Sequence, residues 1–122
     1  MTNATIKDYQ DIENVMNKYV EGVKSGSSEI MKNSFHKGAT MYGYLEGAGL
    51  LEGSINNLYS FVDQSGPADK LLARIDITEV IGTVASVRVE LEGMHGANVV
   101  DLHQLLKVDG QWKIIGKVFH QL

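Results

Sequence analysis

An aspartate and a histidine lie two residues apart near the end of this 122-residue chain, in the stretch VVDLHQLLKVDGQWKIIGKVFH (Val99 to His120). Alternate residues of a β-strand point to the same side, so Asp101 and His103 would share one face of a strand. A carboxylate next to an imidazole fixes the tautomer of the ring and raises its basicity, which suits general acid–base catalysis. The spacing therefore indicates a catalytic pair in which Asp101 orients His103 and His103 moves a proton.

The surrounding stretch has the pattern of a long β-hairpin closed by Asp109-Gly110, since Asp-Gly is typical of a two-residue turn. Counting outward from this turn gives these cross-strand pairs: Lys107 with Trp112, Leu105 with Ile114, His103 with Gly116, Asp101 with Val118 and Val99 with His120. The apolar members indicate the side that helices cover, so Asp101 and His103 would point inward. Buried carboxylates and imidazoles are costly unless they are hydrogen-bonded or hydrated. We therefore expect this face to pass from a packed core into a ligand cavity, with Gly116 leaving space there.

The turn GMHG, residues 93–96, leaves the register of the preceding strand open. In one register Glu92 faces Ala97. Arg88 then lies beside Asp101, and the aspartate becomes half of an ordinary surface pair. In the other register, with one residue fewer in the turn, four apolar residues join the face of the aspartate: Ala85, Val87, Val89 and Leu91. We prefer the second register because it collects the apolar alternation on one side, although the sequence is compatible with both.

Further side chains that could contact a ligand are three aromatic residues and one more histidine. They are Tyr19, His36, Tyr44 and Trp112. A tyrosine hydroxyl can polarise a carbonyl group, and aromatic rings suit a flat ligand. The four histidines, at positions 36, 95, 103 and 120, show neither HxH nor HExxH spacing, so we expect no metal site. The absence of cysteine excludes thiolate chemistry, and without a glycine-rich nucleotide or phosphate motif no cofactor is expected.

The elements that must position these residues divide the chain into two halves. Apolar residues recur every three or four positions in the first half, which predicts helices over 5–24 and 28–35 and a third that Ser54 caps and SGP at 65–67 ends. Between the second and third helices, HKGATMYGYLEGAGLLEG predicts a short strand and a tight return. From Leu71 onward the period is two, and the expected strands are 71–81, 84–92, 97–108 and 111–121. Helices followed by strands predict one α+β domain over 1–122, with the first helix across the concave face of a strongly curved antiparallel sheet.

Charge and composition restrict the class of partner. The net charge is −4, and acidic and basic residues are interspersed along the chain without a basic stripe, so we expect no nucleic-acid binding. The first residues, MTNATIKDYQ, lack the apolar run of a signal peptide, and no stretch approaches the ~18 apolar residues of a membrane span. A cytoplasmic protein that does not enter a membrane is therefore expected.

The order of these segments resembles the nuclear transport factor 2-like superfamily. The segments are a long amphipathic helix, FHKGATMYG (Phe35 to Gly43), IDITEVIGTVASVRVEL (Ile75 to Leu91) and DLHQLLKVDGQWKIIGKVF (Asp101 to Phe119). Within the superfamily, the chain is most similar to small bacterial families described as polyketide-cyclase-like or putative lumazine-binding. The resemblance covers nearly the whole chain and implies a cone-shaped α+β fold.

The resemblance leaves two classes of function open, because this scaffold serves isomerases, dehydratases, epoxide hydrolases, cyclases and binding domains. The ketosteroid isomerases of the superfamily use an inward Asp or Glu base opposite a Tyr and a protonated Asp, and the chain has no clean match to that trio. Its dehydratases use a His and an Asp with paired tyrosines, which His103, Asp101, Tyr19 and Tyr44 match in residue type.

We prefer a small-molecule binding or accessory protein, whose apolar cavity holds a ring-shaped metabolite, because a complete catalytic set is missing. The alternative is a cofactor-independent lyase or isomerase, dehydratase-like or cyclase-like, in which His103 and Asp101 perform acid–base catalysis.

The other face of the hairpin predicts an assembly. It carries a row too apolar for a solvated sheet: Leu102, Leu106, Ile115 and Phe119. We expect a homodimer through this outer face, which is also how the resembled family commonly associates.

Overall fold

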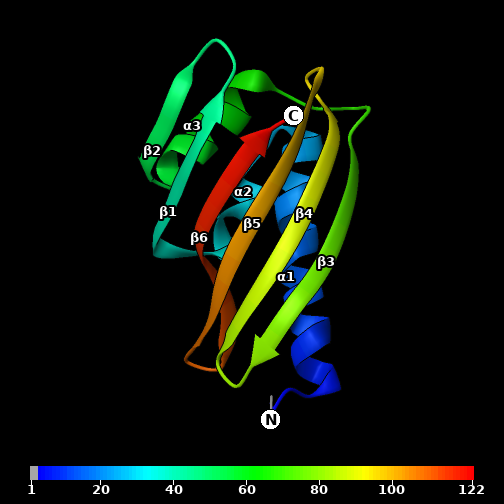
Figure 1. Cartoon of the computed structure of the whole chain (residues 1–122), viewed down its shortest axis with the longest axis vertical. Coiled ribbons are helices and arrows are strands. Elements are labelled where there is room, and N and C mark those ends of the chain that lie inside the picture. Colours follow the sequence, from blue (N-terminus) through cyan, green and yellow to red (C-terminus); the bar gives the residue numbers. More distant parts are fainter. Residues whose placement is uncertain (1–2) are drawn as a thin grey trace.

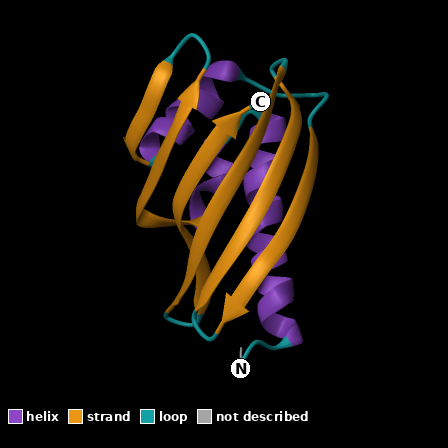
Figure 2. Cartoon of the chain, viewed as in Figure 1, coloured by secondary structure: helices purple, strands orange, loops and turns teal. Residues whose placement is uncertain are grey.

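The computed structural model describes residues 3–122, which form helices packed on one side of a single mixed sheet (Figures 1 and 2). The helical segments are α1 (Ile6–Ser25), α2 (Ser28–Met31), the 3₁₀ turn η1 (Lys32–Ser34) and α3 (Asn56–Ser65). The strands are β1 (Phe35–Leu45), β2 (Gly49–Ser54), β3 (Leu72–Ile81), β4 (Val84–Met94), β5 (Ala97–Val108) and β6 (Gln111–Gln121). The predicted α+β class, with N-terminal helices on a curved sheet, is confirmed.

The strand order is β2-β1-β6-β5-β4-β3, and it departs from the prediction at one pairing. The strands β3 to β6 form the expected antiparallel meander. β1 and β2 form an antiparallel hairpin, longer than the short strand and return that the sequence indicated. β1, however, runs parallel to β6. A parallel neighbour requires a long crossover, and here the crossover comprises β2, α3 and the rest of the meander.

Helix α1 forms where the sequence places it, because both its ends carry capping residues. The Thr5 hydroxyl oxygen accepts a hydrogen bond from the Asp8 backbone N–H at 3.1 Å, and the Asp8 carboxylate accepts one from the Thr5 N–H at 3.1 Å. Gly26 ends the helix in the left-handed conformation, with φ of 68°. One face of the helix is buried on the sheet, through Ile12, Met16, Tyr19 and Val23. This packing fixes Tyr19 in the interior.

The second and third helices depart slightly from their predicted ends. The expected helix over 28–35 is one α-helical turn followed by η1, and Phe35 already begins β1. The Ser54 hydroxyl accepts a hydrogen bond from the Asn56 N–H at 3.1 Å, but the N-cap position of α3 is occupied by Ile55, one residue after the expected Ser54. Among the described residues, no helix is both long and apolar enough to cross a membrane.

The β4–β5 register is the preferred one of the two. Val87 faces His103 and Val89 faces Asp101, whereas Arg88 faces Leu102 on the opposite side of the sheet. Asp101 and His103 are accordingly fully buried under the helices.

The β5–β6 register agrees with the prediction only as far as Ile114, because a β-bulge follows it. Leu105 faces Ile114 as counted, but Gln104 faces Gly116, which leaves one extra residue on β6. The partners of the candidate pair change accordingly. His103 faces Lys117 instead of Gly116, and Asp101 faces Phe119 instead of Val118. The bulge therefore turns Lys117 and Phe119 inward and Val118 outward, since one extra residue reverses every following side chain.

Candidate functional site

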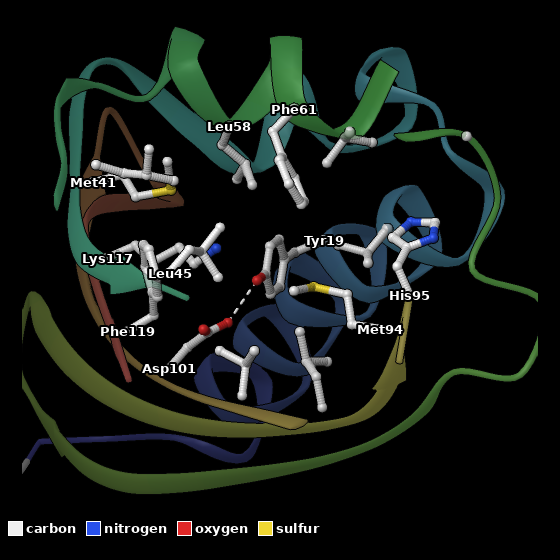
Figure 3. A pocket seen from close by; sticks show the side chains of 16 residues that line it. Tyr19, Met41, Leu45, Leu58, Phe61, Met94, His95, Asp101, Lys117 and Phe119 are labelled. Atoms are coloured by element: carbon white, nitrogen blue, oxygen red, sulfur yellow. Dashed lines mark hydrogen bonds between the residues drawn. The ribbon is translucent and has the colours of Figure 1, made fainter. Parts of the chain in front are cut away.

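A small pocket lies between α1, α3, β1 and the concave side of the meander (Figure 3). Leu58 and Phe61 of α3 cover it, and Met94 at the end of β4 and His95 in the following turn border it on one side. Its lining is almost entirely apolar, and the ionisable side chains on it are Tyr19, His95, Asp101 and Lys117. The cavity encloses about 30 Å³, which is room for one or two water molecules. In this conformation the apolar cover is closed over the polar groups beneath.

Asp101 is the centre of the polar group at the pocket floor. The Tyr19 hydroxyl donates a hydrogen bond of 2.5 Å to Asp101 Oδ2. His103 Nε2 lies 3.2 Å from the same oxygen. An ionised carboxylate only accepts hydrogen bonds, so we assign the imidazole proton to Nε2. Asp101 Oδ1 has no hydrogen-bond partner, although it is buried.

The two members of the Asp–His pair are placed differently with respect to the pocket. Asp101 lines the pocket, whereas His103 does not. The His103 ring packs edge-on against Tyr19, with 4.9 Å between ring centroids, and it reaches the pocket only through its hydrogen bond to Asp101. The prediction of a buried pair in contact is correct, and Asp101 is the member of the pair that lines the pocket.

Lys117 is one of the ionisable pocket residues that the sequence analysis missed. Only 6% of it is exposed. Its Nζ lies 5.1 Å from the centroid of the Tyr19 ring and 5.4 Å from that of Phe119. The available signal was Gly116, because an isolated glycine inside a strand is typical of a bulge, and a bulge re-aims the side chains that follow it.

Burial and mutual charge determine the ionisation of the polar group. Burial alone would raise the pKa of Asp101, but the positive charge of Lys117 opposes this. The hydrogen bonds from His103 and Tyr19 also favour the carboxylate, and the pKa of Asp101 lies below its ordinary value. Burial raises the pKa of the Tyr19 hydroxyl most strongly, and the negative charge of Asp101 raises it further. Tyr19 is therefore a hydrogen-bond donor, and Asp101 is an anion.

The two basic groups respond to burial in the opposite direction. Desolvation lowers the pKa of His103, and the nearby Asp101 only partly compensates, so the ring is neutral near pH 7. Desolvation also lowers the pKa of Lys117, again opposed by Asp101. The pocket floor thus combines a carboxylate with a lysine that is easier to deprotonate than a surface lysine.

Three of the predicted ligand contacts lie elsewhere. His36 is half-buried, and its Nδ1 accepts a hydrogen bond from the Gly38 N–H at 3.0 Å. Tyr44 is 68% exposed. The Trp112 indole N–H donates to Asp8 Oδ1 at 3.2 Å, near the start of α1. None of the three lines the pocket. Of the four predicted contacts, Tyr19 alone does.

Among residues 3–122, no three His, Asp or Glu side chains cluster so that they could hold a metal ion. His95 borders the pocket from the β4–β5 turn, where its φ is 51°, and it was not among the predicted site residues. The floor of the pocket presents the carboxylate of Asp101, the phenol of Tyr19 and the amine of Lys117.

Comparison with solved structures defines the class of fold. An NTF2-like protein of unknown function from Methylobacillus flagellatus KT superposes with a TM-score of 0.93 at 39% identity, covering 99% of this chain and 97% of that one. An NTF2-like protein of unknown function from Shewanella baltica OS155 gives 0.91 at 33% identity, covering 98% of both chains. The chain therefore has the nuclear transport factor 2-like fold.

The family follows from the sequence. The model of the family described as "Putative lumazine-binding" matches residues 7–120, so the chain belongs to that family, as its segments indicated. A curated relative, aldolase FrzH from Cladobotryum sp, is 35% identical over 119 residues, covering 97% of this chain and 94% of the relative. The relatives thus include a protein named as an enzyme.

Proposed function

We propose that the chain is an acid–base enzyme of the aldolase or isomerase class, which removes a proton from the carbon next to a carbonyl group. The observation that carries the proposal is the asymmetry of Asp101. Its Oδ2 is held by Tyr19 and His103, while its Oδ1 is buried without a partner in a residue that lines the pocket. An oriented carboxylate with one unused oxygen is suited to accept a proton from a bound molecule.

The surroundings keep Asp101 in the ionised form that can accept a proton. The apolar pocket has room for only one or two water molecules, and both protein donors bind the carboxylate oxygen that the reaction does not need. Removal of an α-proton creates negative charge on the carbonyl oxygen of the substrate, and Lys117 supplies a second ionisable group on the same pocket. That a relative of 35% identity is named an aldolase supports this class of chemistry.

The pocket must open for most substrates. Its 30 Å³ is far below the roughly 300–1,000 Å³ that drug-sized ligands occupy. The partly exposed side chains on its lining are Leu45, Leu51, Phe61 and Met94. We infer that these side chains repack when a ligand enters, with the flexible methionine as the most adaptable of them.

A binding protein without turnover is the second candidate, and the predominantly apolar lining and the family description favour it. In that case Asp101 and Lys117 would satisfy polar groups of the ligand. The two candidates differ in one measurable property, because a binding protein leaves the α-protons of its ligand in place.

Proton exchange in D₂O separates the candidates. Acetone, hydroxyacetone and pyruvate are incubated with the protein, and replacement of α-hydrogen by deuterium is followed by NMR. We expect the protein to accelerate exchange of at least one probe, and Asp101→Asn to lower this rate by about 10²–10⁴-fold, the usual contribution of a general base. Asp76→Asn, on the outer face, is the control and should retain the rate. Equal rates in wild type and Asp101→Asn would refute the role of Asp101.

We also propose that two copies of the chain associate through the outer face of the sheet. The bulge changes the composition of this surface, because Phe119 is buried inside and Val118 takes its place. Tyr42 and Leu102 lie on either side of Val118 on the neighbouring strands, and all three are about half exposed. These residues, together with Ile115, form the outer apolar cluster.

A further inference from the structure

A β-bulge in β6 turns the Lys117 side chain toward the pocket. Without the bulge between Ile114 and Gly116, Lys117 would occupy the outer face, where a lysine needs no explanation. With the bulge it is buried opposite His103 and lines the same pocket as Asp101.

The surroundings of its amine offer no permanent partner. Lys117 Nζ makes no hydrogen bond and no ion pair with any residue in the described part of the chain, and the aromatic rings of Tyr19 and Phe119 lie beside it. A lysine that serves only the fold keeps its ammonium in water or on a carboxylate. Asp101 acts on Lys117 through space, outside ion-pair distance. Figure 3 shows both residues on the floor of the pocket, beside Tyr19.

We propose that Lys117 forms an imine with the carbonyl carbon of the substrate, so that the pocket takes an aldehyde or ketone with a hydrogen on the neighbouring carbon. The inference rests on the carbonyl chemistry proposed above and extends it to a covalent intermediate. Amines in apolar pockets are nucleophilic because desolvation favours their neutral form. Burial accordingly lowers the pKa of Lys117, and each unit of lowering gives about tenfold more neutral amine.

Asp101 can carry the proton that has to move during imine formation. The Lys117 ammonium gives a proton to Asp101 Oδ1 through a water that the cavity can hold. The neutral amine then attacks the carbonyl carbon, a C–N bond forms, and the nitrogen loses a proton as the carbonyl oxygen gains one. The protonated Asp101 returns its proton to the hydroxyl of this carbinolamine, the C–O bond breaks, and water leaves. The products are a protonated imine and the Asp101 carboxylate.

The Asp101 carboxylate can then act as the base in the next step. Its Oδ1 accepts the α-proton of the imine, and the electrons of the C–H bond become the double bond of a neutral enamine. Attack of the enamine on an aldehyde would complete an aldol addition, and reprotonation at carbon would complete an isomerisation. Hydrolysis of the imine regenerates Lys117. Asp101 and Lys117 thus need to face one pocket without being bonded to each other, as they do here.

The test uses acetylacetone, a diketone that converts a reactive lysine into a stable enaminone with near-ultraviolet absorbance. We expect one equivalent to add with loss of one water, and peptide mass mapping to place it on Lys117. Lys117→Arg keeps the positive charge but cannot form the adduct, and Lys117→Met serves if arginine prevents folding, which circular dichroism reports. Lys113→Arg, on the same strand and partly exposed, is the matched control and should keep the adduct.

The outcomes separate this inference from the proposed function. Absence of an adduct on Lys117, or labelling of Lys113 at the same rate, overturns the imine. Full α-proton exchange in Lys117→Arg together with lost exchange in Asp101→Asn also overturns it, while the proposed function stands. Conversely, an adduct on Lys117 with unchanged exchange in Asp101→Asn supports the imine and refutes Asp101 as the base. If Lys117→Arg forms no adduct, and α-proton exchange is lost in both Lys117→Arg and Asp101→Asn, the result supports the imine and the proposed function together.

Discussion

His103 touches the pocket only through Asp101, and this indirect position gives it a distinct signature at the scale of a single residue. Its ring is fully buried, and burial lowers its pKa. In the unfolded chain a histidine titrates near pH 6.5. Between that value and the lower folded pKa, the unfolded state binds more protons than the folded state, so the free energy of unfolding falls as the pH falls.

We therefore expect the wild-type protein to lose stability when the pH is lowered from about 7 to about 5, and His103→Asn to flatten this dependence. Thermal or urea unfolding measured across that range is the readout. His120→Asn, which replaces an exposed histidine, is the control. A steep acid loss that persists unchanged in His103→Asn would contradict the assignment of a neutral buried ring.

At the scale of elements, the β1–β6 pairing depends on a glycine. A Cβ placed on Gly43 of β1 would lie 2.6 Å from both the Phe119 ring and the Phe119 carbonyl oxygen of β6. The carbonyl oxygen belongs to the backbone of β6, which pairs with β1 at this position, so it can move only if the strand shifts. We expect Gly43→Ala to cost roughly 1–3 kcal/mol of unfolding free energy, as overpacking usually does.

Gly116 on the adjacent strand is the matched control. A Cβ there would meet only the Thr40 hydroxyl, at 4.0 Å, and its φ is not positive. Gly116→Ala should therefore be neutral or stabilise the protein by up to about 1 kcal/mol. Denaturant unfolding of both variants measures the difference, and equal effects would show that the close approach of β1 to β6 is not as described.

The elements themselves could largely be predicted, because each depends on local rules. The period of α1, its Thr5 and Gly26 ends and the Asp109-Gly110 turn follow from short segments of sequence. The parallel neighbour of β6 could not be predicted in this way. That pairing joins strands far apart in the chain, and no local signal specifies it.

The site could be predicted only up to the bulge. Counting pairs from the Asp109-Gly110 turn is correct to Ile114 and wrong beyond it, because a two-residue period carries any extra residue through every later position. Lys117 was missed for this reason. Trp112 was misplaced for a different reason. It pairs with Lys107, which lies six residues from Asp101 along β5, or about 20 Å of strand. Residues that share a face need not share a pocket.

At the scale of the whole molecule, the helices cover one face of the sheet and leave the other open (Figure 2). The open face has two parts. On β3 and β4 it carries the ion pairs Arg74–Asp76 and Arg88–Glu90, which suit contact with water. On β1, β6 and β5 it carries the outer apolar cluster. An interface between two copies would therefore centre on Val118 and avoid the charged part.

We expect the wild-type chain to be a dimer at tens of micromolar, because a stable interface buries about 1,200–2,000 Å² and a sheet face can supply that area. Val118 and Leu102 are 55% and 54% exposed, so a charge at either position leaves the fold intact. At a paired interface, however, Val118→Glu or Leu102→Glu would bury two like charges side by side, and both variants should be monomers. Ile6→Glu, at a position of α1 that is 78% exposed, is the control and should remain a dimer. Light scattering after size-exclusion chromatography measures all four proteins. A wild-type monomer, or dimers that survive both glutamate substitutions, would show that this face does not pair two copies.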